Sequence, residues 1–309
     1  MKGCVATVGT FDGVHRGHMA IIDELLRQAA DRGLDSLVIT FNRHPLEVIA
    51  PAKAPRLAVA RGESAERLRQ AGVSEVSQID FTPELARLRA REFIRLVRER
   101  YNVAVMVMGF DNSFGSDRLA SHDDYIRAAD DEGVELMFVD PVYTPDGQKI
   151  SSSLMRKAVA AGDLGFNAVL SQWPVTVSGT VERGKRNGHK LGFPTVNIRP
   201  DEGVESLPTG VYAARWASDM AKDGGYVYGV LNIGHNPTIA EGNKLTYEFH
   251  APGVDLGERY GQPFRVEVLS RLRGEKKFGS LDELKAAISA DIKELESRYG
   301  LAQNSNEPA

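Results

Sequence analysis

A glycine- and histidine-rich segment near the N-terminus has the residue types that bind phosphate. The string GTFDGVHRGH, residues 9–18, follows an apolar run and precedes an amphipathic helical pattern. His15 and His18 come from one turn, and their ring N–H groups can donate hydrogen bonds to phosphate oxygens. The start of a helix adds a partial positive charge. The glycines that let backbone amides approach a phosphate are Gly9, Gly13 and Gly17.

Spacing alone leaves two other interpretations of this segment open. One is an ordinary glycine turn with two surface histidines. The other is a zinc site, but zinc needs a third ligand, and the sequence has neither an HExxH-like helix nor a cysteine cluster. The single cysteine, Cys4, lies in an apolar run and is expected to be a buried small hydrophobe. The segment also lacks the lysine of a P-loop, which excludes that class.

A second segment, residues 179–198, combines glycines, cations and oxygen-bearing side chains. Thr195 and Asn197 are two residues apart, so they share one face of an extended segment. A hydroxyl and a carboxamide on one face suit Mg²⁺ bound to ATP. A basic hairpin turn before a half-buried strand is the alternative. The residues expected to wrap a triphosphate or supply its cations are Gly184, Lys185, Arg186, Gly188 and Lys190.

The first 150 residues or so alternate apolar runs with helical patterns. Strands separated by helices predict a parallel sheet with right-handed crossovers, covered on both faces. Ligands of such sheets bind at the carboxyl ends of the strands, where residues 9–18 fall. Strands are expected at 5–9, 36–41, 75–81, 103–110 and 134–142, and helices at 19–31, 64–72, 91–101 and 123–133, with Gly33 as the C-cap of the first helix.

The second half of the chain has strand patterns without helices between them. Antiparallel pairing in a small barrel satisfies such a series. A closing helix is expected at 280–299, with Ser280 as N-cap and Glu283 at the capping-box position. The fold class is therefore α/β plus all-β, with the joint between about 157 and 174. The strands are expected at 175–182, 211–217, 226–234, 245–250 and 264–272.

Composition limits the partners and the compartment. The chain has 309 residues, of which 42% are hydrophobic and 26% charged, the balance of a globular protein. A net charge of −4 gives no basis for binding nucleic acid or an anionic membrane. We find no apolar run of membrane-spanning length and no export signal. The cytoplasm is therefore the expected compartment, and a monomer the default state.

The first segment resembles the HxGH nucleotidyltransferases. The longer string FDGVHRGH is similar to the FAD synthetases of the bifunctional bacterial riboflavin kinase/FMN adenylyltransferase family. Further matches follow in order: FNRHP with His44 and Pro45, Arg56 after Pro55, GFDNSFG with Asp111 and Phe114, and ISSSLMR with Ser152 and Arg156. Ser152 and Arg156 lie one helical turn apart and can share a phosphate if Ser152 opens a helix.

This resemblance implies a Rossmann-like domain at 1–165 with a five-stranded parallel sheet, which adenylylates FMN with ATP and releases pyrophosphate. His15 and His18 are the implied catalytic residues. The implied flavin-side residues are His44, Pro45, Arg56 and Phe114. The implied ATP and phosphate contacts are Gly9, Phe11, Asp12, Gly13, Gly17, Asp111, Ser152 and Arg156.

The second segment resembles the riboflavin kinase signature, and YEFH (247–250) is among the further matches. The resemblance implies a six-stranded antiparallel, Greek-key-like barrel with a terminal helix at 166–301, followed by a disordered tail at 302–309. Glu248 is the implied base toward the ribityl 5′-hydroxyl. The implied ATP site is Gly184, Lys185, Gly188, Lys190, Gly192, Pro194, Thr195 and Asn197, of which Thr195 and Asn197 bind Mg²⁺.

The leading hypothesis is synthesis of FAD from riboflavin in two ATP-dependent steps. The substrates would be riboflavin, FMN and ATP, with Mg²⁺ as the cation. One alternative keeps only one active step, and another is a nucleotidyltransferase with a different acceptor. A third is a flavin-nucleotide-binding regulator without turnover.

Overall fold

The chain forms two compact units. The computed structural model describes residues 3–184, 192–217, 225–235 and 245–301. The predicted joint between about 157 and 174 covers the stretch where the chain alternates between units, and the boundary at 165/166 stays a prediction. The first unit comprises Met1–Lys157 and Ala168–Trp173, and the second comprises Ala158–Asn167 and Pro174–Ala309.

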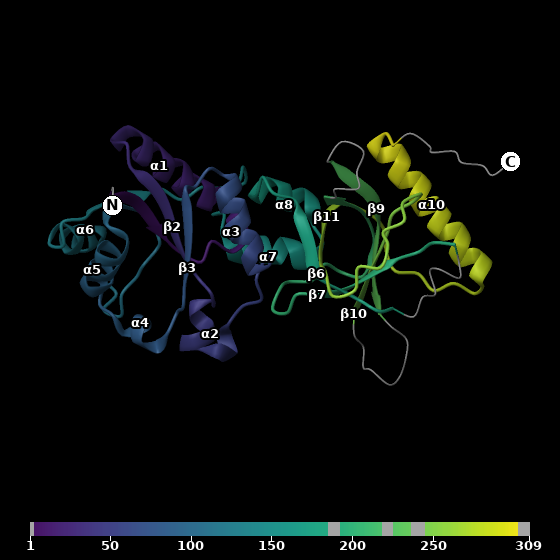
Figure 1. Cartoon of the computed structure of the whole chain (residues 1–309), viewed down its shortest axis with the longest axis horizontal. Coiled ribbons are helices and arrows are strands. Elements are labelled where there is room, and N and C mark those ends of the chain that lie inside the picture. The colour runs from purple at the N-terminus through teal and green to yellow at the C-terminus, as the bar shows by residue number, and fades with distance from the viewer. Residues whose placement is uncertain (1–2, 185–191, 218–224, 236–244, 302–309) are drawn as a thin grey trace. The chain divides into compact units, whose positions relative to one another are not determined.

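The first unit contains a five-stranded sheet in the order β3-β2-β1-β4-β5, and every pairing in it is parallel (Figure 1). This confirms the predicted sheet. The chain direction across the sheet reverses between β1 and β4, and ligands of such sheets bind in the crevice at that point. The strands are β1 (Cys4–Val8), β2 (Asp35–Phe41), β3 (Glu75–Ile79), β4 (Val103–Gly109) and β5 (Glu135–Val139).

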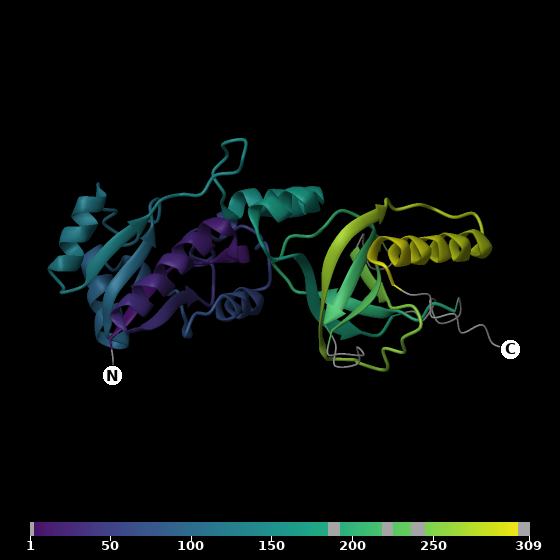
Figure 2. The ribbon, with the colours of Figure 1, turned by 90° about the horizontal axis from the view of Figure 1, so that it is seen from above.

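Helices cover both faces of this sheet, as the alternation along β1 shows. Val5 packs on one face with Ile22 of α1 (Arg16–Arg32) and Leu68 of α3 (Arg61–Gln70). Ala6 packs on the other face with Phe93 of α5 (Ala90–Tyr101) and Ala129 of α6 (His122–Asp130). Figures 1 and 2 show these helices around the strands. The side chains on both faces of β1 are thus buried.

The long helices end near where the sequence places them, but the short ones were not predicted. Gly33 ends α1 with a φ of 62°, the left-handed conformation of a glycine C-cap. Most of the other elements have seven residues or fewer and are too short to show a helical period, whereas α7 has 10 residues. They are η1 (Asp12–Val14), α2 (Pro45–Ile49), η2 (Pro51–Lys53), α4 (Pro83–Arg87), α7 (Ser152–Ala161) and α8 (Leu164–Leu170).

The second unit is a closed barrel of six strands in the order β10-β7-β6-β11-β8-β9, with antiparallel pairing throughout (Figure 1). β11 returns to lie beside β8, so β8 to β11 form a Greek key, as predicted. The strands are β6 (Val175–Glu182), β7 (Val196–Pro200), β8 (Gly210–Ala217), β9 (Tyr226–His235), β10 (Leu245–His250) and β11 (Pro263–Arg273).

The closing helix α10 (Leu281–Tyr299) packs on the outside of the barrel through Leu295 (Figure 2). Ser280 Oγ accepts the Glu283 N–H at 3.2 Å, which confirms Ser280 as N-cap. The Glu283 carboxylate accepts the N–H of Gly279 at 2.9 Å instead of the N–H of Ser280, so the expected capping box is shifted by one residue. Among the described helices, none has the length and apolar content to cross a membrane.

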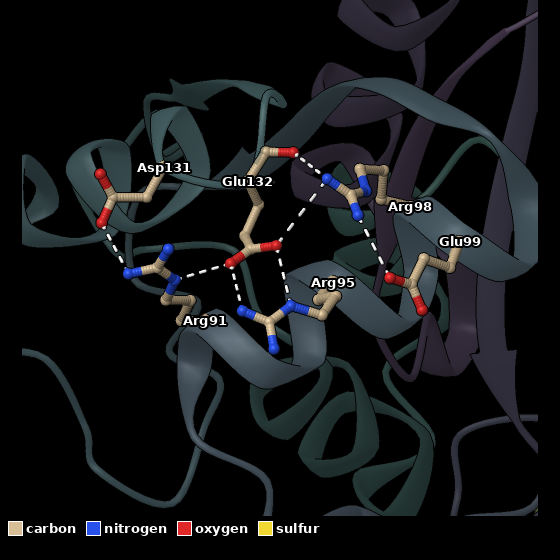
Figure 3. A network of polar contacts seen from close by, with 6 residues as sticks. All are labelled: Arg91, Arg95, Arg98, Glu99, Asp131 and Glu132. Atoms are coloured by element: carbon tan, nitrogen blue, oxygen red, sulfur yellow. Dashed lines mark hydrogen bonds and ion pairs between the residues drawn. The ribbon is translucent and has the colours of Figure 1, made fainter.

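A cluster of ion pairs joins α5 to the turn after α6 (Figure 3). The Glu132 carboxylate accepts hydrogen bonds from Arg91 Nε at 2.6 Å and Arg95 Nη2 at 2.8 Å. Arg98 Nη1 donates to the backbone oxygen of Glu132 at 2.8 Å. The hydrogen bonds from Arg95 and Arg91 lower the pKa of Glu132 to about 2. The ionised carboxylate therefore stabilises the packing of α5 beside α6 on this face of the sheet.

We expect Glu132→Gln to lower the melting temperature at pH 7, by an amount that shrinks on acidification. A carboxyl whose folded pKa lies near 2 contributes stability above its usual pKa of 4.5 and loses it as the pH falls toward 2. Melting curves of both proteins from pH 7 to pH 3 measure the difference. Glu99→Gln is the matched control, because Glu99 lies on the same face and pairs only with Arg98 among the described ion pairs. A pH-independent gap would contradict the assignment.

Candidate active sites

The turn after β1 has an unusual backbone. Phe11, Gly13 and Val14 have φ values of 46°, 79° and 48°, in the left-handed region that non-glycine residues rarely adopt. Packing holds the two side chains, since Phe11 and Val14 are buried. A Cβ on Gly13 would lie 2.5 Å from Met155 Sδ. Glycine therefore suits this position, because its φ is positive and because a Cβ would displace the Met155 side chain of α7.

A buried polar network fixes this turn from behind. The Asp12 carboxylate accepts hydrogen bonds from the Ala58 N–H at 2.8 Å and from Arg156 Nη1 at 2.9 Å. Arg67 Nη1 donates to the Gly13 carbonyl at 2.9 Å, and Ser152 Oγ donates to the Asp12 carbonyl at 3.1 Å. Burial raises the pKa of Asp12, and the hydrogen bond from Arg156 opposes that effect.

In this structure Asp12 and Arg156 thus bind each other, and their predicted contacts with phosphate stay predictions. Sequence reasoning missed Arg67, because nothing local relates residue 67 to residue 13. Its signal would have been an arginine on the apolar face of a helix, where an unpaired cation is costly. α7 does begin at Ser152, as the pairing of Ser152 with Arg156 required.

The two histidines lie together at the start of α1. Their rings stack with centroids 3.7 Å apart. His15 Nδ1 accepts the N–H of His18 at 3.3 Å, so the proton of the neutral ring is on Nε2. Burial lowers the pKa of His15 to about 4 and that of His18 well below its usual range. Both rings are therefore neutral hydrogen-bond donors at pH 7.

One cavity of about 590 Å³ lies at the carboxyl edge of the sheet. Its polar lining comes from the turn after β1, the loop after β4 and the start of α7. Its apolar lining comes from the segments after β2 and β3 and from α5. The predicted residues in the lining are Gly9, Phe11, His15, Gly17, His18, Pro45, Asp111, Phe114 and Ser152, and the aromatic rings of Phe41, Phe81 and Phe93 join them.

Two of the predicted flavin-side residues lie elsewhere. His44 caps α2 by accepting the Leu46 N–H at 3.2 Å, and it lines a separate cavity of about 20 Å³. Arg56 is exposed and is not in the lining of the large cavity, nor is His44. Their predicted contact with flavin stays a prediction.

Lys149 is a lining residue that sequence reasoning missed. It forms an ion pair with the Asp111 carboxylate, which lowers the pKa of Asp111. Since both histidines are neutral, Lys149 and Arg118 are the cations among the residues that line this cavity. The position of Lys149, two residues before the serines of ISSS, was the available signal.

Strand register assembles the second site. Asn197 on β7 lies opposite Glu248 on β10, and Asn232 on β9 lies opposite Glu248 on its other side. Directly opposed side chains point to the same face. Tyr247 and Phe249 belong to the barrel core, so Glu248 and its partners face outward. Burial raises the pKa of Glu248. Asn232 was missed because register is not visible in the sequence.

A cavity of about 770 Å³ lies beside this row and is lined by the predicted residues Gly184, Gly192, Pro194, Thr195 and Asn197. Its described lining does not include Glu248. A Cβ on Gly184 would lie 2.2 Å from Asn197 Nδ2, so only glycine lets the backbone pass there. The predicted Lys185, Gly188 and Lys190 lie outside the described residues.

The oxygen donors of Thr195 and Asn197 fit Mg²⁺, which takes few protein ligands and completes its shell with water and phosphate oxygens. Among the described residues, no group of three or more His, Cys, Asp or Glu side chains could hold a metal ion.

Each unit has its own fold and its own cavity, and comparisons with known proteins match a different family model to each half of the chain. A family model described as FAD synthetase matches residues 1–154, and one described as riboflavin kinase matches residues 171–299. The bifunctional riboflavin kinase/FMN adenylyltransferase of Pseudomonas fluorescens is 36% identical over 294 residues, 94% of this chain and 91% of that protein. The chain belongs to the bifunctional riboflavin kinase/FMN adenylyltransferase family.

One further relative supports the same family, and one solved structure matches the fold. The Escherichia coli K12 protein of the same description is 34% identical over 303 residues, 98% of this chain and 95% of that protein. A crystal structure described as a macrolide-efflux protein from Streptococcus pneumoniae has a TM-score of 0.83 and 28% identity, and the match covers 96% of this chain and 94% of that one. Its fold matches this chain over nearly the whole length.

We expect the His15 ring to titrate near pH 4. Burial disfavours the imidazolium, so the ring stays neutral well below the usual 6.5. The ¹H and ¹³C shifts of the histidine Cε1–H groups, followed from pH 8 to pH 4, measure this, and His15→Asn assigns the signal. A His15 midpoint near 6.5 would contradict the effect of burial on this ring.

Proposed function

We propose that the chain makes FAD from riboflavin in two ATP-dependent steps, one in each unit. The second unit phosphorylates riboflavin to FMN. The first unit then transfers AMP from ATP to FMN and releases pyrophosphate. The observation that carries the proposal is that each unit has its own cavity beside its own motif. The names of the relatives, which state both reactions, support it.

In the first unit, the proposed chemistry is in-line attack of an FMN phosphate oxygen on the α-phosphorus of ATP. The bond to the β-phosphate oxygen breaks, and no covalent enzyme intermediate forms. The Nε2–H of His15 and the ring N–H of His18 donate to phosphate oxygens as charge develops. Neutral donors avoid the cost of desolvating an imidazolium in a buried turn. Gly9, Gly17 and Ser152 offer further phosphate contacts.

The apolar lining of the same cavity suits the flavin ring. Phe41, Phe81 and Phe114 provide aromatic surface for a flat heterocycle, and Pro45 lies with them in the lining. Lys149 and Asp111 already pair within this cavity, so the lysine can shift to a phosphate oxygen when a nucleotide binds. We assign Lys149 to the leaving pyrophosphate.

In the second unit, the ribityl 5′-hydroxyl attacks the γ-phosphorus of ATP, and ADP leaves. Glu248 takes the hydroxyl proton, and its burial brings its pKa closer to neutral pH, where a base is most effective. Thr195 and Asn197 would hold Mg²⁺, which neutralises charge on the phosphates when bound. Gly184 and Gly192 line the same cavity, and because they have no side chains they leave room for the triphosphate.

Binding of ATP, Mg²⁺ and the flavins to the residues named above is therefore part of this proposal. The cytoplasm as compartment and a monomer as the working state stay predictions from the sequence.

Incubation of the purified protein with riboflavin, ATP and Mg²⁺ should give FMN first and FAD later. Chromatography with flavin fluorescence separates the three flavins over time. FAD formed from supplied FMN but not from riboflavin would leave one active step. Tight flavin binding without any phosphorylated product would instead support a regulator.

Two substitutions should separate the steps. Glu248→Gln removes the proposed base and should slow FMN formation by about 100-fold or more, while FMN is still converted to FAD. His18→Ala removes a donor to the transferring phosphate and should slow FAD formation by about 100-fold, while riboflavin is still phosphorylated. Rates of both reactions are measured for each variant, so each variant carries its own folding control. Loss of both reactions in either variant would contradict the assignment.

A further inference from the structure

A histidine on β10, His250, lies next to the proposed kinase residues Thr195, Asn197 and Glu248. Glu248 lies opposite Asn197, and Phe249 lies opposite Val196. His250 and Thr195 are the next residues beyond this last described pair. Glu248 and His250 are two apart on β10 and therefore share one face of that strand, and His250 lines the same cavity as Thr195 and Asn197.

The regular pairing of β7 does not reach Thr195. In the described part of the barrel, pairing with β10 ends at Val196, and pairing with β6 ends at Asn197. The proposed metal ligand Thr195 thus lies just beyond the hydrogen-bonded ladder, in the segment that enters β7. Something other than the ladder must fix its position.

His250 supplies that contact. Its Nδ1 lies 2.8 Å from the carbonyl oxygen of Pro194, and the side chain is buried, with 7% of the residue exposed. A carbonyl oxygen only accepts hydrogen bonds, so Nδ1 carries the proton. The ring also meets Phe193 edge-on, with centroids 5.5 Å apart. His250 is therefore held in one orientation by its neighbours.

The geometry of the peptide bond carries this contact to Thr195. The Pro194 carbonyl, the Thr195 nitrogen and the Thr195 Cα lie in one rigid plane. Fixing the carbonyl oxygen therefore fixes the plane and the point from which the Thr195 side chain starts. His250 lines the same cavity as Thr195 and Asn197, so this restraint acts at the wall of the nucleotide cavity.

We propose that His250 is a positioning residue of the kinase reaction: its Nδ1–H holds the Pro194 carbonyl and keeps the Thr195 hydroxyl beside the Asn197 carboxamide for Mg²⁺ and ATP phosphates. This inference rests on the proposed kinase function of the second unit. His250 has no direct part in the chemistry. Its loss should weaken the use of Mg²⁺ and nucleotide more than the binding of riboflavin.

The test compares three substitutions in the full chain. Asn places its amide N–H₂ where Nδ1 was, so His250→Asn keeps the donor. Gln places its amide near the position of Nε2, and Leu has no donor, so His250→Gln and His250→Leu remove it. His235→Gln, at an exposed position on β9, is the matched control. Melting temperature and conversion of FMN to FAD are measured for every protein.

Two readouts report on the site itself. The first is the Mg²⁺ concentration that gives half-maximal FMN formation. The second is the dissociation constant of ADP, measured by calorimetry in the presence of Mg²⁺, and it needs no turnover. We expect His250→Gln and His250→Leu to raise both values about tenfold, the order expected for one lost hydrogen bond to a buried group. The KM for riboflavin, the melting temperature and FAD formation should change little, and His250→Asn should resemble the unsubstituted protein.

The outcomes separate the inference from the function on which it rests. If the unsubstituted protein makes no FMN, the proposed function fails. If it makes FMN and His250→Gln matches it in both readouts, the positioning role fails. If His250→Asn is as impaired as His250→Leu, or if riboflavin KM and melting temperature change with the Mg²⁺ response, His250 only fills space, which also overturns the proposal.

Discussion

The adenylyltransferase site depends on one buried carboxylate. Asp12 is tied to Arg156 and to the Ala58 N–H, and its own carbonyl accepts from Ser152. These bonds join the turn after β1, the loop before α3 and the start of α7, three segments far apart in the sequence. Removing one partner of such a pair typically costs about 3–5 kcal/mol, because the other charge is left buried. The strained backbone at Phe11 and Val14, and with it the placement of the histidines, persists because this network and the packing around it leave no alternative.

The two sites use different means to hold phosphate. In the first unit, the proposed contacts with the nucleotide are a helix start and neutral histidine donors, and the charged residues behind them hydrogen-bond to backbone groups. In the second unit, strand pairing sets Asn197, Glu248 and Asn232 side by side, and hard oxygen donors suit a cation that would travel with ATP. One site is thus built from a turn, and the other from the register of a barrel.

Local patterns predicted most of the fold. Period-two and period-3.6 patterns indicated the parallel sheet, five of the six barrel strands and the long helices, and Gly33 marked the end of α1; β7 was not among the predicted ranges. The short helices α2 and α4 escaped because five residues show no period. Within the sites, motif residues such as His15, His18 and Asn197 were found because their neighbours in sequence are also neighbours in space. Arg67, Lys149, Asn232 and His250 were not, because their roles arise from contacts between distant segments.

The alternation of the chain between the units has a consequence for how such an enzyme could be divided. Residues 158–167 belong to the barrel unit, whereas 168–173 belong to the sheet unit, where Trp173 packs against the core and lies 5.8 Å from Arg67. By this division, a single cut before residue 158 separates 168–173 from the sheet unit, and a single cut after residue 173 separates 158–167 from the barrel unit. Neither cut leaves both units complete. Gene fission into two monofunctional enzymes would require a second copy of this stretch or its redesign.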